Sequence, residues 1–422
     1  MPGMIEHKLF AEGRTLMTTP LAAVSGIRIG ATNAEIRQHM GMSQKDRDDL
    51  VLIEIAEGAH TAAVFTRNAF CAAPVQLARH HLGETEPRFL LINAGNANAG
   101  TGDSGLRDAR ACCEAVAEYA GCRPEAVLPF STGVIGEPLP VDCIRAGVVG
   151  AREGLSSSGW ESAARAIMTT DTAPKGVSRR VETADGPFTI TGIAKGSGMI
   201  RPNMATMLVF IATDAAVAPD VLRHVLAHAV EHSFHRITVD GDTSTNDACV
   251  LMATGTADLP MLDRIEEARY GIFQQAVTEV CEVLAKTIIQ DAEGANKFIT
   301  IEARGGASEE ECMDVAFSIA HSPLVKTAFF AGDPNWGRIL AAVGRAGLSD
   351  FDIGKVRIFL NDVCIVASGA RAEGYTETEG QRVMASPEIT IRIELGRGSR
   401  NATVWTCDLS YDYVRINAEY RT

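Results

Sequence analysis

The pattern of apolar residues changes along this chain, and this change constrains the fold most. Alternating apolar and polar residues predict strands at about 49–57 and 60–67, and a buried apolar run predicts another at 88–95. Helical spacing dominates the middle of the chain, with clear examples at 219–234 and about 262–290. Strand patterns return in the last third. This distribution favours a layered α/β or α+β architecture over a doubly wound parallel sheet, in which strands and helices alternate throughout.

The remaining elements are assigned by the same periodicities. The threonine-rich turn MTTDT is expected to follow one of the middle helices. Helices are expected over 106–121 and 141–155, and a helix leading into this threonine-rich turn over 161–172. A strand and loop are expected over 126–140, a strand–turn–strand unit over 235–255, and further strands within 297–305, 356–369, 388–396 and 401–410.

Size and composition describe an ordinary globular protein. The 422 residues are enough for one large or two medium domains, and 46% of them are hydrophobic against 22% charged. The longest apolar runs, such as 207–212, fall far short of the roughly 20 residues that a membrane-spanning helix needs. The N-terminal segment MPGMIEHKLFAEGR lacks the apolar stretch of a secretory signal.

Charge and cysteine usage narrow the functional classes. A net charge of −14 argues against a surface for nucleic acid or an anionic membrane. An anionic small molecule is still a possible substrate, because it needs only a local Lys or Arg. Ten cysteines occur without any CxxC pair, which predicts reduced structural thiols in a cytoplasmic protein.

Two glycine-rich segments resemble nucleotide-binding loops but depart from them. Gly100–Gly105 matches GxGxxG, yet the residues NANA separate it from the preceding strand, so a tight polar loop is the better interpretation. Gly332–Arg338 resembles a phosphate loop, but Arg338 and Ile339 replace the Lys and the Ser or Thr of that motif. We interpret it as a structured loop.

Three histidines repeat at helical spacing. His224, His228 and His232 would project from successive turns of one helix, too far apart along its axis for one ion to bind all three. A solvated stripe is the better interpretation, and no metal site is predicted.

The segment 195–215, KGSGMIRPNMATMLVFIATDA, places Ala205 and Thr206 where a glycine- and proline-interrupted stretch meets a predicted buried strand. A threonine hydroxyl is activated when a base accepts its proton, and the α-amine of an N-terminal threonine can serve as that base. An internal threonine reaches this state only if the preceding peptide bond is cut. An ordinary strand-start threonine also fits this segment, because strands favour threonine.

This segment and others, in the same order, resemble the ornithine acetyltransferase family, whose members are also called bifunctional arginine biosynthesis proteins or glutamate N-acetyltransferases. The similarity extends from about Ala22 to Thr422. Besides the segment containing Thr206, it is carried by LINAGNANAGTGDSG, STGVIGEPLP, AIMTTDTAPK, TVDGDTSTND, DAEGANKF, SPLVKTAFFAGDPNWGRI and YVRINAEYRT.

The resemblance implies a set of functional residues at the matching positions. Thr206 matches the nucleophile, with self-cleavage between Ala205 and Thr206, and Thr132 with Gly133 matches the pair that stabilises the oxyanion. The substrate-binding set comprises Thr169 (with Thr170 as the alternative one residue on), Lys195, Thr206, Glu293, Asn417 and Thr422.

The resemblance also implies the architecture and assembly. It predicts an αββα-type sandwich like that of N-terminal-nucleophile-like enzymes, in a main α/β domain of about 1–295. A smaller α/β domain of about 296–422 would follow, with its tail returning to the site. Cleavage would give an alpha chain, 1–205, and a beta chain, 206–422, and two of each would form a heterotetramer.

The implied reaction moves an acetyl group from N2-acetyl-L-ornithine to L-glutamate through an acetyl-threonine. It needs no metal or other cofactor, and acetyl-CoA is a possible co-substrate. Three alternatives stay open at this stage: an amidohydrolase or aminopeptidase on the same self-cleaving scaffold, a nucleotide-binding enzyme using one of the glycine-rich loops, and a non-catalytic protein.

Overall fold

The structure is a computed structural model, and it describes residues 16–17, 20–42, 46–201 and 207–419. The chain divides into two compact units. The larger, here called the sandwich unit, contains the described residues up to His235 together with Asp242–Ile288. The smaller, the C-terminal unit, contains Arg236–Gly241 and the described residues from Ile289 onward. The chain therefore crosses between units near 288, a few residues before the expected boundary near 295, and the short segment Arg236–Gly241 is an addition to the expected division.

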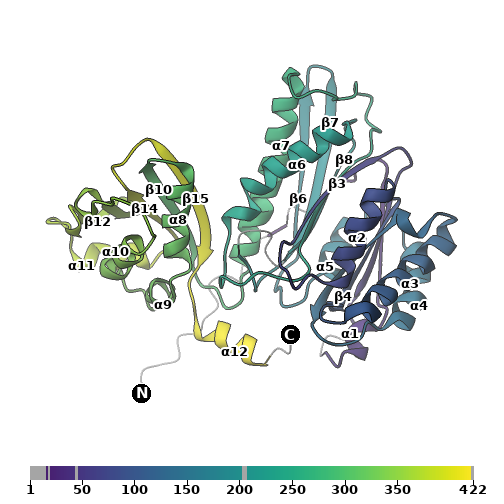
Figure 1. The fold of residues 1–422 in the computed structure, drawn as a ribbon, viewed down its shortest axis with the longest axis horizontal. Coiled ribbons are helices and arrows are strands. Elements are labelled where there is room, and N and C mark those ends of the chain that lie inside the picture. The colour runs from purple at the N-terminus through teal and green to yellow at the C-terminus, as the bar shows by residue number, and fades with distance from the viewer. Residues whose placement is uncertain (1–15, 18–19, 43–45, 202–206, 420–422) are drawn as a thin grey trace. The chain divides into compact units, whose positions relative to one another are not determined.

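The sandwich unit contains two mixed sheets (Figure 1). In the first, β1 and β2 and then β2 and β4 pair antiparallel, whereas β4 and β5 are parallel. In the second, β8 and β9 are parallel and all other neighbours are antiparallel. The first sheet has the order β1 (Ile27–Thr32), β2 (Leu50–Ile55), β4 (Phe89–Asn96) and β5 (Val127–Val134), and the second has the order β3 (His60–Phe65), β9 (Ala248–Ala253), β8 (Leu208–Thr213), β7 (Gly186–Lys195) and β6 (Lys175–Thr183).

The two sheets share one apolar core. Side chains such as Ile53 and Ile92 from the first sheet and Val250 from the second belong to a single buried cluster. Across this layer the rings of Phe130 and Phe210 meet edge to face, with their centroids 5.1 Å apart. The sheets therefore pack face to face.

Helices cover the outer faces of both sheets (Figure 1). On the first sheet, α3 and α4 bury residues such as Cys113 and Val148 against β2, β4 and β5. On the second sheet, α6 packs on β3 and β9, and α7 lies so close to Gly192 of β7 that an added Cβ would be 3.1 Å from Leu284. The layers are thus helix, sheet, sheet and helix, so the predicted αββα sandwich is confirmed. The helices of this unit are α1 (Ile36–His39), α2 (Ala73–Glu84), α3 (Gly102–Ala120), α4 (Val141–Glu153), α5 (Trp160–Ala166), α6 (Pro219–Glu231) and α7 (Ala268–Gln290), with short 3₁₀ turns at Pro124–Ala126 and Phe234–Arg236.

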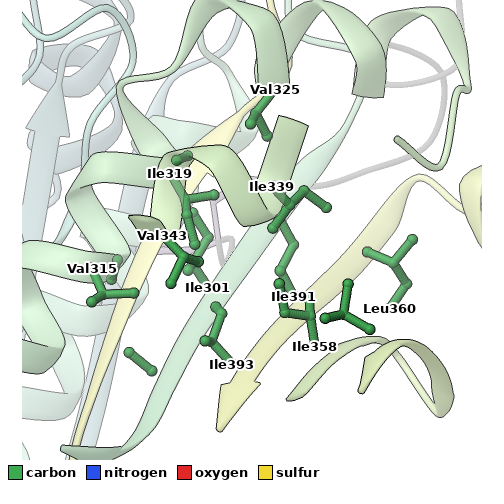
Figure 2. Packing of buried hydrophobic residues seen from close by; sticks show 14 of the residues in the cluster. Ile301, Val315, Ile319, Val325, Ile339, Val343, Ile358, Leu360, Ile391 and Ile393 are labelled. Carbon is green, nitrogen blue, oxygen red and sulfur yellow. The ribbon is translucent and has the colours of Figure 1, made fainter. Parts of the chain in front are cut away.

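The C-terminal unit has its own sheet and its own core. The sheet has the order β13-β12-β11-β14-β10-β15, in which only β10 and β14 are parallel. Figure 2 shows Ile301 and Ile391 of the sheet meeting Ile319 and Val343 of the helices that cover it. The strands are β10 (Phe298–Gly306), β11 (Arg357–Leu360), β12 (Val363–Ala367), β13 (Ala370–Arg371), β14 (Glu388–Glu394) and β15 (Arg400–Cys407), and the helices are α8 (Glu309–Ala320), α9 (Pro323–Ala331), α10 (Trp336–Gly344), α11 (Glu377–Met384) and α12 (Tyr411–Glu419), with a 3₁₀ turn at Ile353–Lys355.

One predicted element is wrong. The segment 235–255 is not a strand–turn–strand unit, because only its second half forms a strand, β9. Residues Arg236–Gly241 of this segment belong to the C-terminal unit, where Ile237 makes a single bridge to Trp405 and the Thr238 N–H donates to the Trp405 carbonyl at 3.1 Å. The strand-like sequence around Ile237 therefore forms one isolated bridge to Trp405 and no extended strand pairing.

Within the part of the chain that the structure describes, no helix has both the length and the apolar character required to cross a membrane.

Candidate functional site

Three segments meet at one end of the second sheet of the sandwich unit. Lys195, the last residue of β7, is paired with Leu208, the first residue of β8. Leu208 is in turn paired with Ala248, the first residue of the parallel strand β9. Residues at the end of β7 and before β8 and β9 are therefore neighbours. The predicted cleavage residues Ala205 and Thr206 lie outside the described residues, but Met207 is described and stands at this sheet end.

Asp247 fixes the backbone of Met207. Its Oδ1 accepts the Met207 N–H at 3.0 Å, and the Met207 carbonyl accepts the Ala248 N–H at 3.1 Å. Asp247 is 1% exposed, and its Oδ2 has no hydrogen-bond partner among the described residues. Burial raises the pKa of this carboxyl well above its ordinary value, although the Met207 N–H, the Ser244 hydroxyl and the charge of Lys195 oppose the rise.

The neighbouring residue Asn246 joins this end of the second sheet to the first sheet. Its amide donates to the carbonyl of Ala97, just after β4, at 2.6 Å and to the carbonyl of Ser131, in β5, at 2.9 Å. Both contacts are buried. Because Ser131 precedes Thr132 and Asp247 holds Met207, hydrogen bonds and the chain together connect the predicted oxyanion pair to the residue that follows the predicted nucleophile.

The predicted oxyanion pair lies at the end of β5. Thr132 is buried, and Gly133 has φ +134°, a value that favours glycine. A Cβ on Gly133 would lie 2.2 Å from the carbonyl carbon of Gly95, so a side chain is excluded there. The β4–β5 ladder loses its regular register at Asn96, next to this contact. The glycine of STGVIG is thus required by the close approach of two backbones.

Asp171 organises a second part of the same sheet end. Its Oδ1 accepts from Lys175 Nζ at 2.7 Å and from the Gly196 N–H at 2.8 Å, while its Oδ2 accepts from the Thr169 N–H at 3.0 Å. The carboxyl thereby ties the MTTDT turn to the end of β7, where Lys195 lies. Both side chains of the Asp171–Lys175 pair are fully buried.

The charges around Asp171 outweigh its burial. Burial alone would raise the pKa of this carboxyl, but the charge of Lys175, then that of Lys195, and the hydrogen bonds from Lys175 and Gly196 hold the pKa well below its ordinary value. Asp171 is therefore ionised at neutral pH. Lys195 is itself 4% exposed.

Both threonines of the MTTDT turn make hydrogen bonds beside Lys195 and Asp171. The Thr169 backbone binds Asp171, and the Thr170 hydroxyl shares a hydrogen bond of 2.7 Å with the Ser197 hydroxyl. Both threonines are half-buried, so the choice between them as a substrate contact stays a prediction.

Glu293 and Asn417 belong to the C-terminal unit, where they contact each other. The Asn417 amide donates to Glu293 Oε2 at 2.8 Å. Gly294, which follows Glu293, has φ +67°. A Cβ at this position would lie 2.5 Å from the Tyr413 nitrogen, so only glycine allows the Glu293 segment to approach the start of α12 this closely. Ser410 closes the arrangement by donating to the Gly294 carbonyl at 2.6 Å. Thr422 lies outside the described residues.

Each of the two glycine-rich segments consists of a short loop followed by the first turn of a helix. Asn98 Oδ1 accepts from the Thr101 hydroxyl at 2.8 Å and its amide donates to the Gly105 carbonyl at 2.9 Å, so the first loop folds on itself. A Cβ on Gly105 would lie 1.9 Å from Thr101 Oγ1, which explains that glycine by packing. In the second loop, Asn335 caps α10 by accepting the Arg338 N–H at 3.1 Å. The interpretation of both segments as loops is therefore only partly right, because Gly102–Gly105 forms the first turn of α3 and Trp336–Arg338 lies in the first turn of α10.

The histidines of α6 make ring contacts, and the cysteines are free thiols. The rings of His228 and His232 stack with their centroids 4.1 Å apart, whereas His224 lies against Tyr270. Among the described residues, His, Cys, Asp and Glu side chains form no group of three or more that could hold a metal ion. All ten cysteines are free thiols, and burial raises the pKa of such thiols as Cys113.

Comparison with known proteins now decides the family. The model of the ArgJ family matches residues 31–422. The arginine biosynthesis bifunctional protein ArgJ of Methylococcus capsulatus is 60% identical over 411 residues, which cover 97% of this chain and 99% of that protein. The protein of the same name from Pseudomonas fluorescens is 54% identical, with 95% and 98% covered.

The chain belongs to the ArgJ family.

The resemblance stated from the sequence is thereby confirmed, and the chain is an acetyltransferase of arginine biosynthesis. Among solved structures, the crystal structure of the ArgJ protein from Bacillus halodurans is 38% identical, covers 49% of this chain and 96% of its own, and has a TM-score of 0.47.

Four site residues escaped the sequence analysis: Asp171, Lys175, Asn246 and Asp247. The signal was present, since these residues lie in or beside the quoted segments AIMTTDTAPK and TVDGDTSTND. In threonine-rich motifs the hydroxyls are the obvious candidates, but here the buried side chains of Asp171, Asn246 and Asp247 make the hydrogen bonds that join the segments.

Proposed function

We propose that this ArgJ protein transfers acetyl from N2-acetyl-L-ornithine to L-glutamate through Thr206, after self-cleavage between Ala205 and Thr206. The observation that carries the proposal is the connection from Ser131 through Asn246 and Asp247 to Met207. It supports a site in which the oxyanion pair and the start of the beta chain are held in one rigid frame.

Self-cleavage would use the chemistry of Thr206 itself. The hydroxyl oxygen attacks the Ala205 carbonyl carbon, the C–N bond breaks, and the hydroxyl proton ends on the departing nitrogen. Water then hydrolyses the resulting ester, which releases the Ala205 carboxylate and restores the hydroxyl. The new α-amine is the base that activates Thr206 for the transfer reaction.

Acetyl transfer would proceed in two halves. Thr206 Oγ attacks the acetyl carbonyl of acetylornithine, ornithine leaves, and the α-amine of glutamate then takes the acetyl group. Thr132 and the Gly133 N–H are the proposed donors to the oxyanion in both halves. Losing one such donor typically raises the barrier by about 2.7–4 kcal/mol.

Substrate recognition would rest on complementary charges. Lys195 is the proposed partner of an α-carboxylate, and Thr169 a further contact beside it. Glu293, oriented by Asn417, is the proposed partner of the ornithine ammonium group, and Thr422 completes the set carried over from the family. A buried cation would let an acidic protein bind two amino acids that each carry an α-carboxylate.

Several finer properties belong to this proposal. We place the enzyme in the cytoplasm as a heterotetramer of two alpha and two beta chains, working without a metal or other cofactor. Acetyl-CoA is a possible acetyl donor for making acetylglutamate directly, which fits the word "bifunctional" in the names of its relatives. A hydrolase on the same scaffold is the second candidate, and the family membership does not favour it.

One assay separates transfer from hydrolysis. Purified enzyme is given acetylornithine with and without glutamate, and ornithine, acetylglutamate and acetate are quantified. Ornithine release that depends on glutamate, with acetylglutamate formed in equal amount, supports the proposal. Acetate formation at the same rate without glutamate would show a hydrolase instead.

A further inference from the structure

Asp408, the residue that follows β15, has no role in the chemistry proposed above and is not among the residues carried over from the family. Its side chain is buried. Its Oδ1 accepts two successive backbone N–H groups, from Asn296 at 2.8 Å and from Lys297 at 2.9 Å, and its Oδ2 accepts the Asn296 side-chain amide at 3.3 Å. One carboxyl therefore fixes the backbone at the end of the turn that leads from Glu293 into β10.

Two later residues of the same segment bind this turn at and beside Glu293. Ser410 donates to the Gly294 carbonyl at 2.6 Å, and Asn417 of α12 donates to Glu293 Oε2 at 2.8 Å. The turn between α7 and β10 is thus bound at both ends, by Asp408 where it enters β10 and by Asn417 at Glu293. The position of the Glu293 carboxyl relative to α12 depends on both contacts.

Lys326 of α9 fixes the backbone on both sides of Asp408. Its ammonium donates to the Cys407 carbonyl and, at 3.0 Å, to the Thr406 hydroxyl, while its own carbonyl accepts the Leu409 N–H at 3.3 Å. Lys326 is itself buried. The Asp408 side chain therefore projects from a backbone that is held before and after it, as a positioning group requires.

The shape of the Asp408 side chain, more than its charge, suits it to this role. Burial raises the pKa of this carboxyl, although the N–H groups of Asn296 and Lys297, the Asn296 amide and the charge of Lys326 oppose the rise. A carboxyl in either protonation state keeps an oxygen that accepts both backbone N–H groups, and so does an asparagine amide. Alanine at this position would leave both N–H groups without their acceptor.

We propose that Asp408 is a positioning residue for recognition of the substrate's side-chain ammonium group: by binding the backbone just before β10, it holds the turn in which Glu293 meets Asn417. Asp408 acts through Glu293 and does not contact substrate. The inference rests on the proposed role of Glu293 and deepens it, because it names a second contact, besides that of Asn417, on which the placement of this carboxylate depends.

The readout is discrimination between N2-acetyl-L-ornithine and N2-acetyl-L-norvaline as acetyl donors. The two have the same carbon chain, but the second lacks the ammonium group assigned to Glu293, so the ratio of their kcat/KM values reports that contact. A merely structural role of Asp408 would lower kcat/KM for both donors together and leave the ratio unchanged.

The variants of the full chain differ in what they leave at position 408. Asp408→Ala and Asp408→Ser cannot accept both N–H groups, and both are expected to lower the ratio about fivefold or more, approaching the loss of a charge-assisted contact. Asp408→Asn keeps the accepting oxygen and should stay within about twofold of wild type. Glu293→Gln is the control for the subsite itself and should lower the ratio about tenfold or more.

Asn361→Ala is the matched control for loss of stability. Asn361 follows β11, and its Oδ1 accepts the Thr390 N–H of β14 at 2.8 Å, a side-chain-to-backbone bond in the same unit. Its removal should lower the thermal stability and leave the ratio at the wild-type value. An equal fall of the ratio in Asn361→Ala and Asp408→Ala would show general destabilisation and overturn the inference.

The outcomes separate this inference from the proposed function. If Glu293→Gln keeps wild-type discrimination, Glu293 does not read the ammonium group and the proposed subsite is wrong. If Glu293→Gln loses it but Asp408→Ala and Asp408→Ser keep it, only the inference is overturned. An Asp408→Asn variant that discriminates no better than Asp408→Ala also overturns it. Intact mass and thermal denaturation of each variant verify processing and folding, and Asp408→Ser carries the test should Asp408→Ala fail to fold.

Discussion

Two buried aspartates at the same sheet end have opposite electrostatic environments. Asp171 accepts three hydrogen bonds and faces two lysines, so its pKa is low. Asp247 accepts the Met207 N–H through Oδ1, and burial outweighs the Met207 N–H, the Ser244 hydroxyl and the charge of Lys195, so its pKa is raised. The isosteric change of each to asparagine should therefore affect stability differently.

Asp171→Asn should destabilise the protein by about 3–5 kcal/mol at pH 7, because the buried charge of Lys175 loses the carboxylate that it contacts. A carboxyl with a depressed pKa stabilises the fold above its unfolded-state pKa, and this contribution disappears as the pH falls through the folded-state pKa. The difference between wild type and Asp171→Asn should shrink accordingly in strong acid. Urea denaturation as a function of pH measures it.

Asp247→Asn should change stability by less than about 1 kcal/mol at pH 7, or increase it, because the amide oxygen still accepts the Met207 N–H and no charge is desolvated. A carboxyl with a raised pKa favours the fold at low pH and loses this advantage as the pH rises above the unfolded-state value. The stability of the asparagine variant relative to wild type should therefore increase as the pH rises. A loss as large as that of Asp171→Asn would show that Asp247 is a stabilised anion.

At the scale of elements, the end of β5 depends on one glycine. Gly133→Ala should cost several kcal/mol and abolish most activity, because its Cβ would meet the backbone of Gly95 and its φ is positive. Gly121→Ala is the matched control: that glycine also has a positive φ, +65°, but a Cβ there meets nothing within 4 Å. Its cost should be about 1 kcal/mol with activity retained. Thermal denaturation and the transfer assay compare the two, and equal costs would contradict the close-approach argument.

The start of α12 depends on one serine. Ser410 Oγ donates to the Gly294 carbonyl and accepts the N–H groups of Asp412 and Tyr413 at 3.2 and 3.3 Å. Ser410→Ala should raise amide exchange throughout α12, since losing such a cap costs about 1 kcal/mol. Because α12 carries Asn417, KM for acetylornithine should rise severalfold and kcat should change less.

The matched control for this change is Ser308→Ala. Ser308 caps α8 in the same unit by accepting the Glu311 N–H at 3.1 Å. Its removal should lower stability by a similar amount without affecting KM for acetylornithine. If both variants alter KM equally, the effect of Ser410 is general destabilisation and not the orientation of the Glu293 segment.

Strongly periodic elements were predictable from the sequence, and those whose neighbours decide their form were not. The buried strand at 88–95 appears as β4 (Phe89–Asn96), and the helix at 219–234 appears as α6 (Pro219–Glu231). Sequence patterns gave no sign of β1, the β6–β7 hairpin or the helices α8–α11. In β6, three of nine residues are half-buried and three are exposed, so no apolar alternation identifies it.

At the scale of the whole molecule, two separate cores stabilise the two units. One joins the facing sheets of the sandwich, around residues such as Phe130 and Phe210, and the other joins the C-terminal sheet to its helices. The site residues also fall into two groups, those that the sequence predicted and those that only the structure revealed. Those predicted by family resemblance are mostly hydroxyls, charges and a glycine in recognisable motifs. The buried Asp171, Asn246 and Asp247 connect segments far apart in the chain, and only the fold reveals such partners.

The central claim is that this ArgJ protein becomes an acetyltransferase by cutting its own chain before Thr206. Intact mass under denaturing conditions tests it most directly. The purified protein should give two fragments, residues 1–205 and 206–422, of 205 and 217 residues, and Thr206→Ala should give one uncut and inactive chain. A wild-type protein that is uncut and yet fully active in acetyl transfer would contradict the account.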